Sequence, residues 1–320
     1  MSTATRTTKA PPAAEHRSPV RPGRQERLGR TEARWGLLLA APAILGFLIF
    51  TIGPMIASAV FSLTDWRIGG PARFIGLGNY DRLAHDHLFW KSLNVTTYYT
   101  LGVVPLTLLV GFVIAILVNQ GIRGRSLWRT IYYLPTLVPA VASSVLWIWI
   151  FNPDFGLLNS MLRQAGLPES SWIYGEKSAV PSLILMSVWG FGNAMVIFLA
   201  GLQGVPQQLY EAVAIDGGGT WARFRHVTLP FMTPVIFYNL VTGVIGTFQV
   251  FNQAYIMTQG GPNNATEFYI YYLYTKAFTD SEIGYASALA WVLFVIVLVI
   301  TVLLFRNARR WVYYEMGAAR

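Results

Sequence analysis

Charged residues are absent from six long intervals of the sequence, at residues 35–64, 92–122, 130–153, 178–210, 226–266 and 283–305, and the shortest of these holds 23 residues. An α-helix needs about 20 apolar residues to cross ~30 Å of hydrocarbon, and a charged residue at its centre costs ~2.5–3.5 kcal/mol. The density of apolar residues predicts helices at about 36–62, 94–118, 128–151, 180–203, 229–257 and 286–305. The pattern predicts an all-α polytopic membrane protein with six transmembrane helices.

The composition agrees with a membrane protein and excludes several other classes. Hydrophobic residues make up 54% of the 320 residues and charged residues only 12%, about half the ~25% that is usual in soluble domains. Cysteine is absent, which excludes disulfide scaffolds, iron–sulfur clusters, thiolate zinc sites and cysteine nucleophiles. The net charge of +9 would suggest nucleic-acid binding in a soluble protein, so its distribution along the chain decides what it means.

The basic residues of the connecting segments predict the orientation. With a cytoplasmic N-terminus, the inner segments hold 17 of the 24 Lys and Arg residues, and nine of the 15 acidic residues lie outside. Positive segments resist translocation, so both termini are predicted to be cytoplasmic. The positive charge is therefore a topology signal, and we expect no nucleic-acid partner.

The segments outside the spans complete the predicted organisation. Residues 1–34 are basic, rich in Pro and Thr, and predicted to form a disordered cytoplasmic tail. The apolar run from Trp35 to Leu63 is longer than the 7–15 residues of a signal-peptide core and is interpreted as an anchor. The transmembrane domain is predicted to cover residues 35–306, and residues 307–320 to form a short cytoplasmic tail.

One predicted cytoplasmic loop, residues 204–228, has a distinctive pattern. A short helix is expected after Pro206, and Gly217, Gly218 and Gly219 should end it, because glycine enters left-handed turns at little cost. Thr220 is predicted to cap a second helix beginning at Trp221. Glu211 lies on the short helix beside small alanines, which suits docking of another protein's backbone and a cationic partner. An amphipathic connector lying on lipid headgroups is the alternative interpretation.

This loop resembles the cytoplasmic signature of ABC-importer permeases, the EAA motif: Glu-Ala-Ala, three residues, Gly, nine residues, Ile, any residue, Leu-Pro. The matching residues are Glu211, Ala212, Val213, Gly217, Val227, Leu229 and Pro230, with Val replacing Ala at position 213 and Ile at position 227. Segments similar to the carbohydrate branch, the maltose-type and glycerol-phosphate-type permeases, are FIGLGNY at 74–80, YYLPTLVPAVASSVLW at 132–147 and MTQGGP at 257–262. The resemblance covers about residues 35–306.

The resemblance implies a set of partners and a bacterial inner-membrane location. In the family the short helix seats in a groove of a cytoplasmic ATPase dimer, a second homologous permease completes the pathway, and an extracytoplasmic solute-binding protein delivers the cargo. It implies that ATPase coupling falls on Glu211, Ala212, Asp216 and Gly217. It also implies a sugar-class substrate, with membrane lipid surrounding the helices.

The predicted fifth helix has a polar stripe. At 100° per residue, one arc of about 120° collects Asn239, Thr242, Gly243, Gly246, Gln249 and Gln253. Amides facing lipid would lack hydrogen-bond partners, so this face should line other helices or a watery cavity. Trp189 and Asn193 in the fourth helix, and Thr136 between two prolines in the third, are further candidates for a substrate path. Helix packing is the alternative role of the stripe.

Amides, hydroxyls and aromatic rings recognise neutral polyols, and the predicted spans contain no Lys, Arg, Asp or Glu apart from Arg129 at the start of the third. This pattern favours a neutral solute. In the family, sugar contacts come from the same three helices, and Gly190, Gly243 and Thr247 match contact positions there. A glycerol-phosphate importer and an ion-gradient-driven carrier remain the alternatives.

Several catalytic signatures are absent from the sequence. There is no Gly-x-x-x-x-Gly-Lys-Ser/Thr phosphate loop, so a partner must bind the ATP. Neither Gly-x-Ser-x-Gly nor His-Glu-x-x-His occurs, and His85 and His87 are interpreted as loop residues. We therefore expect a transport subunit that is not an enzyme and that has no cofactor, metal site or catalytic residue.

Overall fold

The computed structural model describes the backbone of residues 22–121 and 123–313, and side chains from residue 35 onward within these ranges. Apart from one isolated β-bridge between Thr64 and Phe74, the regular structure of the described residues is helical. The α-helices are α1 (Pro22–Phe47), α2 (Gly53–Ser62), α3 (Gly78–His85), α4 (His87–Asn119), α5 (Arg125–Leu137), α6 (Ala140–Ile150), α7 (Leu157–Gln164), α8 (Ala179–Val188), α9 (Gly192–Gln203), α10 (Gln207–Ile215), α11 (Thr220–Arg223), α12 (Leu229–Phe248), α13 (Tyr269–Tyr274) and α14 (Ile283–Ala308). Shorter helical turns are η1 (Leu48–Ile52), η2 (Trp172–Tyr174), η3 (Phe224–Thr228), η4 (Ala254–Thr258) and η5 (Thr275–Thr279).

The described chain divides into two units, one ending at Ala57 and the other beginning at Ser58. The first unit contains α1, η1 and the start of α2, which follow one another as a continuous helical path. The apolar stretch Trp35–Ser62, which begins in this unit, contains an 18-residue segment with a mean hydropathy of 2.2. Residues 1–21 of the predicted tail lie outside the described residues, and from Pro22 the backbone is helical. Pro22 occupies the first position, where its fixed backbone angle suits a helix.

Within residues 22–121 and 123–313, four helical stretches and two bent pairs are long and apolar enough to cross a membrane. The unbent stretches are Trp35–Ser62, His87–Asn119, Thr220–Phe248 and Ile283–Ala308, and the pairs are α5 with α6 and α8 with α9. These six regions coincide with the six predicted helices, so the all-α polytopic fold is confirmed.

The predicted continuous helix over 128–151 is wrong, because α5 and α6 meet at 94°. Val138 between them is extended (ψ 125°) and precedes Pro139, and a residue before proline is forced out of the helical region. The pair α8 and α9 bends by 42° at residues 189–191.

The predicted helix over 229–257 ends early. α12 stops at Phe248, and a backbone bond from Gln249 N–H to Gly246 O closes its last turn. Residues 249–251 are not helical, and the helical path resumes at Asn252. Gln253 therefore belongs to a different segment from Asn239.

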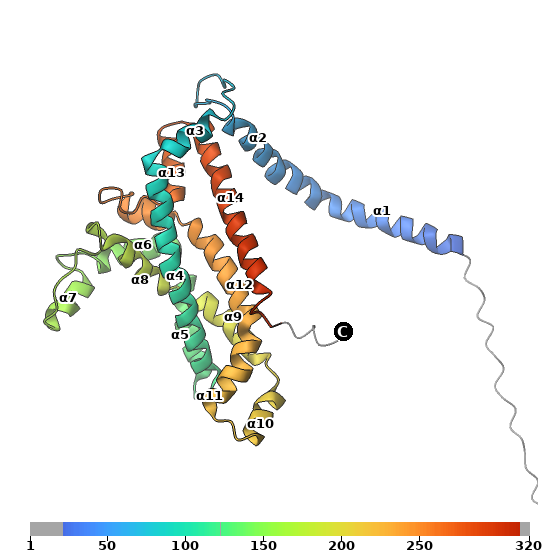
Figure 1. The fold of residues 1–320 in the computed structure, drawn as a ribbon, viewed down its shortest axis with the longest axis vertical. Helices are drawn as coiled ribbons and strands as arrows, with labels where there is room; N and C mark the ends of the chain where they lie inside the picture. Colours follow the sequence, from blue (N-terminus) through green and yellow to red (C-terminus); the bar gives the residue numbers. More distant parts are fainter. Residues whose placement is uncertain (1–21, 122, 314–320) are drawn as a thin grey trace, which may run out of the picture. The chain divides into compact units, whose positions relative to one another are not determined.

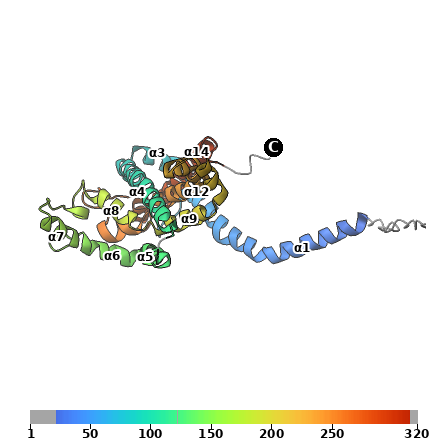
Figure 2. The same cartoon turned by 90° about the horizontal axis from the view of Figure 1, so that it is seen from below.

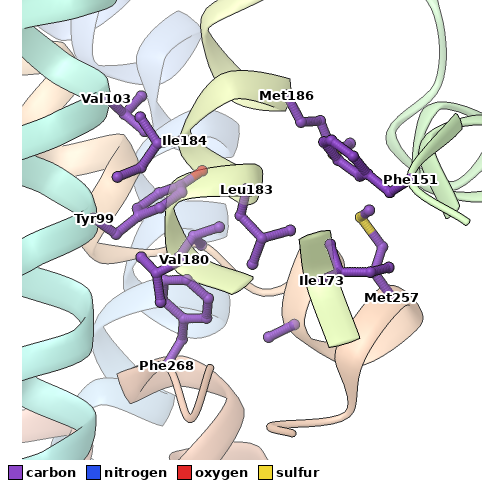
Figure 3. Close-up of a cluster of buried hydrophobic side chains, with 12 residues drawn as sticks. Tyr99, Val103, Phe151, Ile173, Val180, Leu183, Ile184, Met186, Met257 and Phe268 are labelled. Atoms are coloured by element: carbon purple, nitrogen blue, oxygen red, sulfur yellow. The ribbon is translucent and has the colours of Figure 1, made fainter. Parts of the chain in front are cut away.

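The second unit is built around α4, which packs against α8, α9 and α12 (Figures 1 and 2). Small residues bring the backbones close: a Cβ on Gly111 of α4 would lie 3.1 Å from the Cβ of Ala194 in α9. One buried cluster fills the space between α4 and α8, where Tyr99, Leu183 and Phe268 meet (Figure 3). α10 and α3 lie at opposite ends of this unit (Figure 1).

Polar contacts tie the α3 end together. Asp86 caps α4 by accepting from Leu88 N–H at 2.9 Å, and its other oxygen accepts from the hydroxyls of Tyr272 and Tyr285. Glu282, before α14, pairs with Arg67 at 2.7 Å and with Arg82 at 2.8 Å. The start of α4 is thereby fixed to α13 and α14.

Candidate functional site

A cavity of about 360 Å³, which we call the central cavity, opens where the helices of the second unit are interrupted. Its lining is Tyr99, Pro135, Ser143, Met186, Ser187, Trp189, Gly190, Gly246, Thr247, Gln249, Val250, Phe251, Asn252 and Gln253. These residues come from α4, α5, α6, the end of α8 and the bend that follows it, and from the end of α12 and the break that follows it.

The breaks in the helices place polar groups at this cavity. Irregular backbone inside a membrane is tolerated where it lines a cavity, because its unpaired N–H and C=O groups can find partners there. The non-helical residues 249–251 and the bend at 189–191 both reach the cavity. The same interruptions therefore expose backbone and side-chain polar groups to one space.

The described residues that line the central cavity are all uncharged. Gln249, Asn252 and Gln253 contribute side-chain amides, and Trp189 contributes an aromatic ring that meets Trp147 edge-on at 5.7 Å. The Tyr99 hydroxyl lies 2.6 Å from Ser187 Oγ. Since Ser187 Oγ donates to Leu183 O at 2.8 Å, Tyr99 must donate to Ser187. The lining is a set of neutral hydrogen-bonding groups and aromatic faces, which suits a hydroxylated ligand.

The structure brings together six of the ten predicted path residues: Trp189, Gly190, Gly246, Thr247, Gln249 and Gln253. Thr136, Asn193, Asn239 and Gly243 do not line the cavity. Asn239 is 6% exposed and its amide donates to Val235 O at 3.0 Å. Thr136 donates to Tyr133 O at 2.6 Å, and Gly243 faces Val104. The side chains of Thr136 and Asn239 thus find their hydrogen-bond partners within their own helices.

Sequence reasoning missed part of the lining, chiefly Tyr99, Ser143, Ser187 and Asn252. Tyr99 and Ser187 each lie in an apolar span, and a search for polar residues in every span would have found them. Asn252 follows the unforeseen break after α12, so no helical projection could place it.

The second candidate site is the elbow, which we define as residues 207–223 at the α10 end. Gly217 adopts a left-handed conformation (φ 78°) directly after α10. Gly218 N–H donates to Val213 O at 2.8 Å, and Gly217 N–H to Ala214 O at 3.1 Å. These two bonds form a Schellman motif that ends the helix sharply. The prediction that the glycines terminate the helix is confirmed.

The residues of the elbow that are predicted to contact an ATPase are exposed to solvent. Glu211, Ala212, Asp216 and Gly217 are all exposed, and Ile215 is 86% exposed. The predicted Thr220 cap is wrong by one residue, because α11 begins at Thr220 and Gly219 precedes it without a side-chain cap.

The elbow is joined to the membrane-spanning part. The Tyr210 hydroxyl in α10 lies 3.0 Å from Thr228 Oγ1, and Thr228 directly precedes α12. α11, η3 and α12 form one continuous helical stretch from Thr220 to Phe248. The Tyr210–Thr228 contact therefore connects α10 to the helix that ends at the central cavity.

Comparison with known proteins gives consistent results. Residues 107–312 match the family described as binding-protein-dependent transport system inner membrane component. The chain is 41% identical over 285 residues to the probable ABC transporter permease protein YesP of Bacillus subtilis (strain 168), covering 88% of this chain and 92% of that protein. It is 33% identical over 285 residues to the trehalose/maltose transport system permease protein MalF of Thermococcus litoralis, covering 88% and 96%.

A solved structure has the same architecture. It is a bacterial ABC transporter involved in the import of the acidic polysaccharide alginate, with a TM-score of 0.76 and 25% identity. The match covers 89% of this chain and 99% of that chain. The overall fold of the chain is therefore shared with a known transporter.

Proposed function

The chain belongs to the binding-protein-dependent transport system inner membrane components, and on this premise we propose that it forms half of the transmembrane pathway of a bacterial ABC importer for a sugar or related polyol. A second homologous permease supplies the other half, and a separate ATPase dimer supplies the energy. The subunit itself works by changing shape and performs no chemistry.

The observation that carries the proposal is the geometry of the elbow. An exposed short helix ends in a glycine turn, carries Glu211 and Asp216, and is linked through Tyr210 to the start of α12. This arrangement can receive motion from a soluble partner and pass it to the central cavity. Moving a two-state gate from 1:99 to 99:1 requires about 5.5 kcal/mol of differential binding. The proposed source is the ATPase, acting at Glu211, Ala212, Asp216 and Gly217.

The lining of the central cavity supports a neutral, hydroxylated cargo. A charged cargo in a low-dielectric site needs a countercharge, and the described lining offers none. Amides and tryptophan rings match the hydroxyls and apolar faces of sugars. The name of one similar protein refers to trehalose and maltose. Glycerol phosphate would require basic groups from the second permease.

The proposed orientation places the α10 end in the cytoplasm, with both termini. The excess of Lys and Arg in the segments on that side supports it. The α3 end then faces outward, where a solute-binding protein delivers the cargo. The proposed path residues that line the central cavity are Gly190, Gly246, Thr247, Gln249 and Gln253. Trp189 adds an aromatic ring that a sugar can contact.

Replacement of Glu211 by Lys tests the proposal in the assembled complex. Reversing the charge on the exposed face of α10 should abolish ATP hydrolysis that depends on cargo-loaded binding protein, while membrane insertion stays normal. Gln207→Lys is the matched control, because it adds the same side chain to another exposed position of α10 without removing a carboxylate. Stimulated hydrolysis that is unchanged in Glu211→Lys would refute the coupling role.

A further inference from the structure

The first turns of α4 project beyond the membrane. Its 33 residues span about 50 Å at 1.5 Å per residue, whereas the hydrocarbon core is about 30 Å thick. Residues 101–118 are almost wholly apolar, and polar residues concentrate in 87–100. The projecting part is therefore the N-terminal third of α4, at the α3 end.

A pocket of about 490 Å³ lies against this projecting part, and we call it the lysine pocket. It is formed between α4, the start of α8 and the loop that precedes α13. Its lining is Lys91, Asn94, Val95, Tyr98, Glu176, Lys177, Val180, Pro181, Asn263 and Ala265. It is separate from the central cavity, with which it shares no lining residue.

The charges in the lysine pocket are unbalanced. Neither Lys91 nor Lys177 has a carboxylate within 4 Å in the described part of the chain. Lys91 Nζ donates to Asn263 O at 2.6 Å, which fixes the ammonium group and leaves two of its protons for a ligand. Glu267 attracts Lys91 only at longer range, and Glu176 offsets one of the two positive charges.

The floor of the lysine pocket is formed by apolar residues that pack into the protein core. Val180 belongs to the buried cluster between α4 and α8 (Figure 3). Val95 packs against the same cluster. Tyr98 stands at the pocket and is 52% exposed. A preformed pocket with an apolar floor, an exposed aromatic ring and fixed donors resembles the centre of a protein interface more than a mobile surface.

We propose that the lysine pocket receives an acidic side chain of the extracytoplasmic binding protein, with Lys91 and Lys177 contacting its carboxylate. The inference rests on the proposed function, which requires such a protein at this end of the molecule. Projection beyond the hydrocarbon favours a protein partner over a lipid, and the two lysines specify the sign of its charge. Asn94 and Asn263 supply the polar rim.

The test uses the complete importer in nanodiscs of phosphatidylcholine and its purified binding protein. Lys91→Glu with Lys177→Glu should weaken binding of that protein at least about tenfold, because like charges then meet at the contact. This loss of affinity should become smaller as the salt concentration increases, because salt screens the repulsion. Lys91→Arg with Lys177→Arg keeps both charges and should stay within about threefold of the wild type. Basal ATP hydrolysis without binding protein should not change and reports correct assembly.

Charge-reversal of single acidic residues on the binding protein should identify one that restores affinity to the double-Glu importer. Unchanged affinity in the double-Glu importer would overturn the inference while leaving the proposed function intact. An effect seen only when phosphatidylglycerol replaces phosphatidylcholine would overturn it in favour of a lipid headgroup. If the wild-type complex shows no response to any binding protein, the proposed function fails, and the inference with it.

Discussion

At Gly218 the elbow leaves no room for a side chain. A Cβ there would lie 2.5 Å from Val213 Cγ1 and 2.8 Å from Val213 O, so the backbone itself would have to move. Gly218→Ala should break the Schellman bonds and displace α10 relative to α11. We expect binding-protein-stimulated ATP hydrolysis to fall several-fold, measured in the reconstituted complex.

Gly219 provides the matched control at the next position. Nothing lies within 4 Å of a Cβ built there, and its φ of −78° suits any residue. Gly219→Ala should therefore retain wild-type hydrolysis. If Gly218→Ala and Gly219→Ala reduced ATP hydrolysis equally, the Val213 contact would not be the cause of the loss.

Glu267 is a buried carboxyl group in the loop before α13, 7% exposed. Burial raises its pKa to about 7 from an ordinary value of 4.5, although Lys91 and Lys276 act in the opposite direction. Between pH 4.5 and 7 the folded protein holds a proton that the unfolded chain has lost. Stability should therefore fall as pH rises through this window, and the penalty should be complete above pH 7.

Glu267→Gln should remove this pH dependence. The variant should melt a few degrees higher than the wild type at pH 8, and at the same temperature near pH 4, measured by thermal unfolding in detergent. Glu169 is the control, because Arg163 lowers its pKa and so its charged form stabilises the folded protein. Glu169→Gln should therefore not raise the melting temperature at pH 8. A wild type that is equally stable at pH 5 and pH 8 would contradict the assignment.

At the scale of helices, the sequence predicted where spans lie better than where they break. A long interval without charged residues locates a span, because a charged side chain near the centre of the hydrocarbon raises the free energy of insertion. Pro139 carried a local signal for the bend after α5. Residues 249–251, Gln-Val-Phe, contain neither Pro nor Gly, so nothing local predicted the end of α12. The break depends on contacts of these residues with other elements.

That break decides which residues of the polar stripe face cargo. Gln249→Leu with Gln253→Leu removes two amides from the central cavity and should reduce cargo uptake at least about tenfold, since each lost hydrogen bond is worth roughly 1 kcal/mol. The complex should remain assembled on size-exclusion chromatography. Uptake is measured in proteoliposomes that contain the complete importer.

Thr242→Val tests the helical projection itself. Thr242 shares the predicted stripe but lies outside the cavity, and its hydroxyl donates to Tyr238 O at 2.9 Å. We expect normal uptake. If Thr242→Val impairs uptake as strongly as the glutamine pair, the continuous stripe is the functional surface and the cavity assignment fails.

At the scale of the whole molecule, the proposed function assigns two features of this chain to contacts with partners. Ile215 is almost fully exposed on the elbow, and the central cavity provides neutral groups from one subunit only. The resemblance of residues 211–230 to the EAA motif implied an ATPase contact at this loop, whereas the exposure of Ile215 was not predicted. The lysine pocket could not be foreseen, because residues 91, 177 and 263 are far apart in sequence and meet only when the helices pack.

Dependence on partners gives the broadest prediction, because it separates an ABC importer from an ion-gradient carrier. Proteoliposomes with this chain alone should not accumulate cargo, whereas liposomes with both permeases, the ATPase dimer and external binding protein should do so only with ATP inside. Ionophores that collapse proton and sodium gradients should leave that uptake unchanged, since the described spanning helices place no acidic residue in the central cavity to bind a coupling ion. Uptake by the single chain, driven by a gradient and independent of nucleotide, would show that the elbow is not where the energy enters.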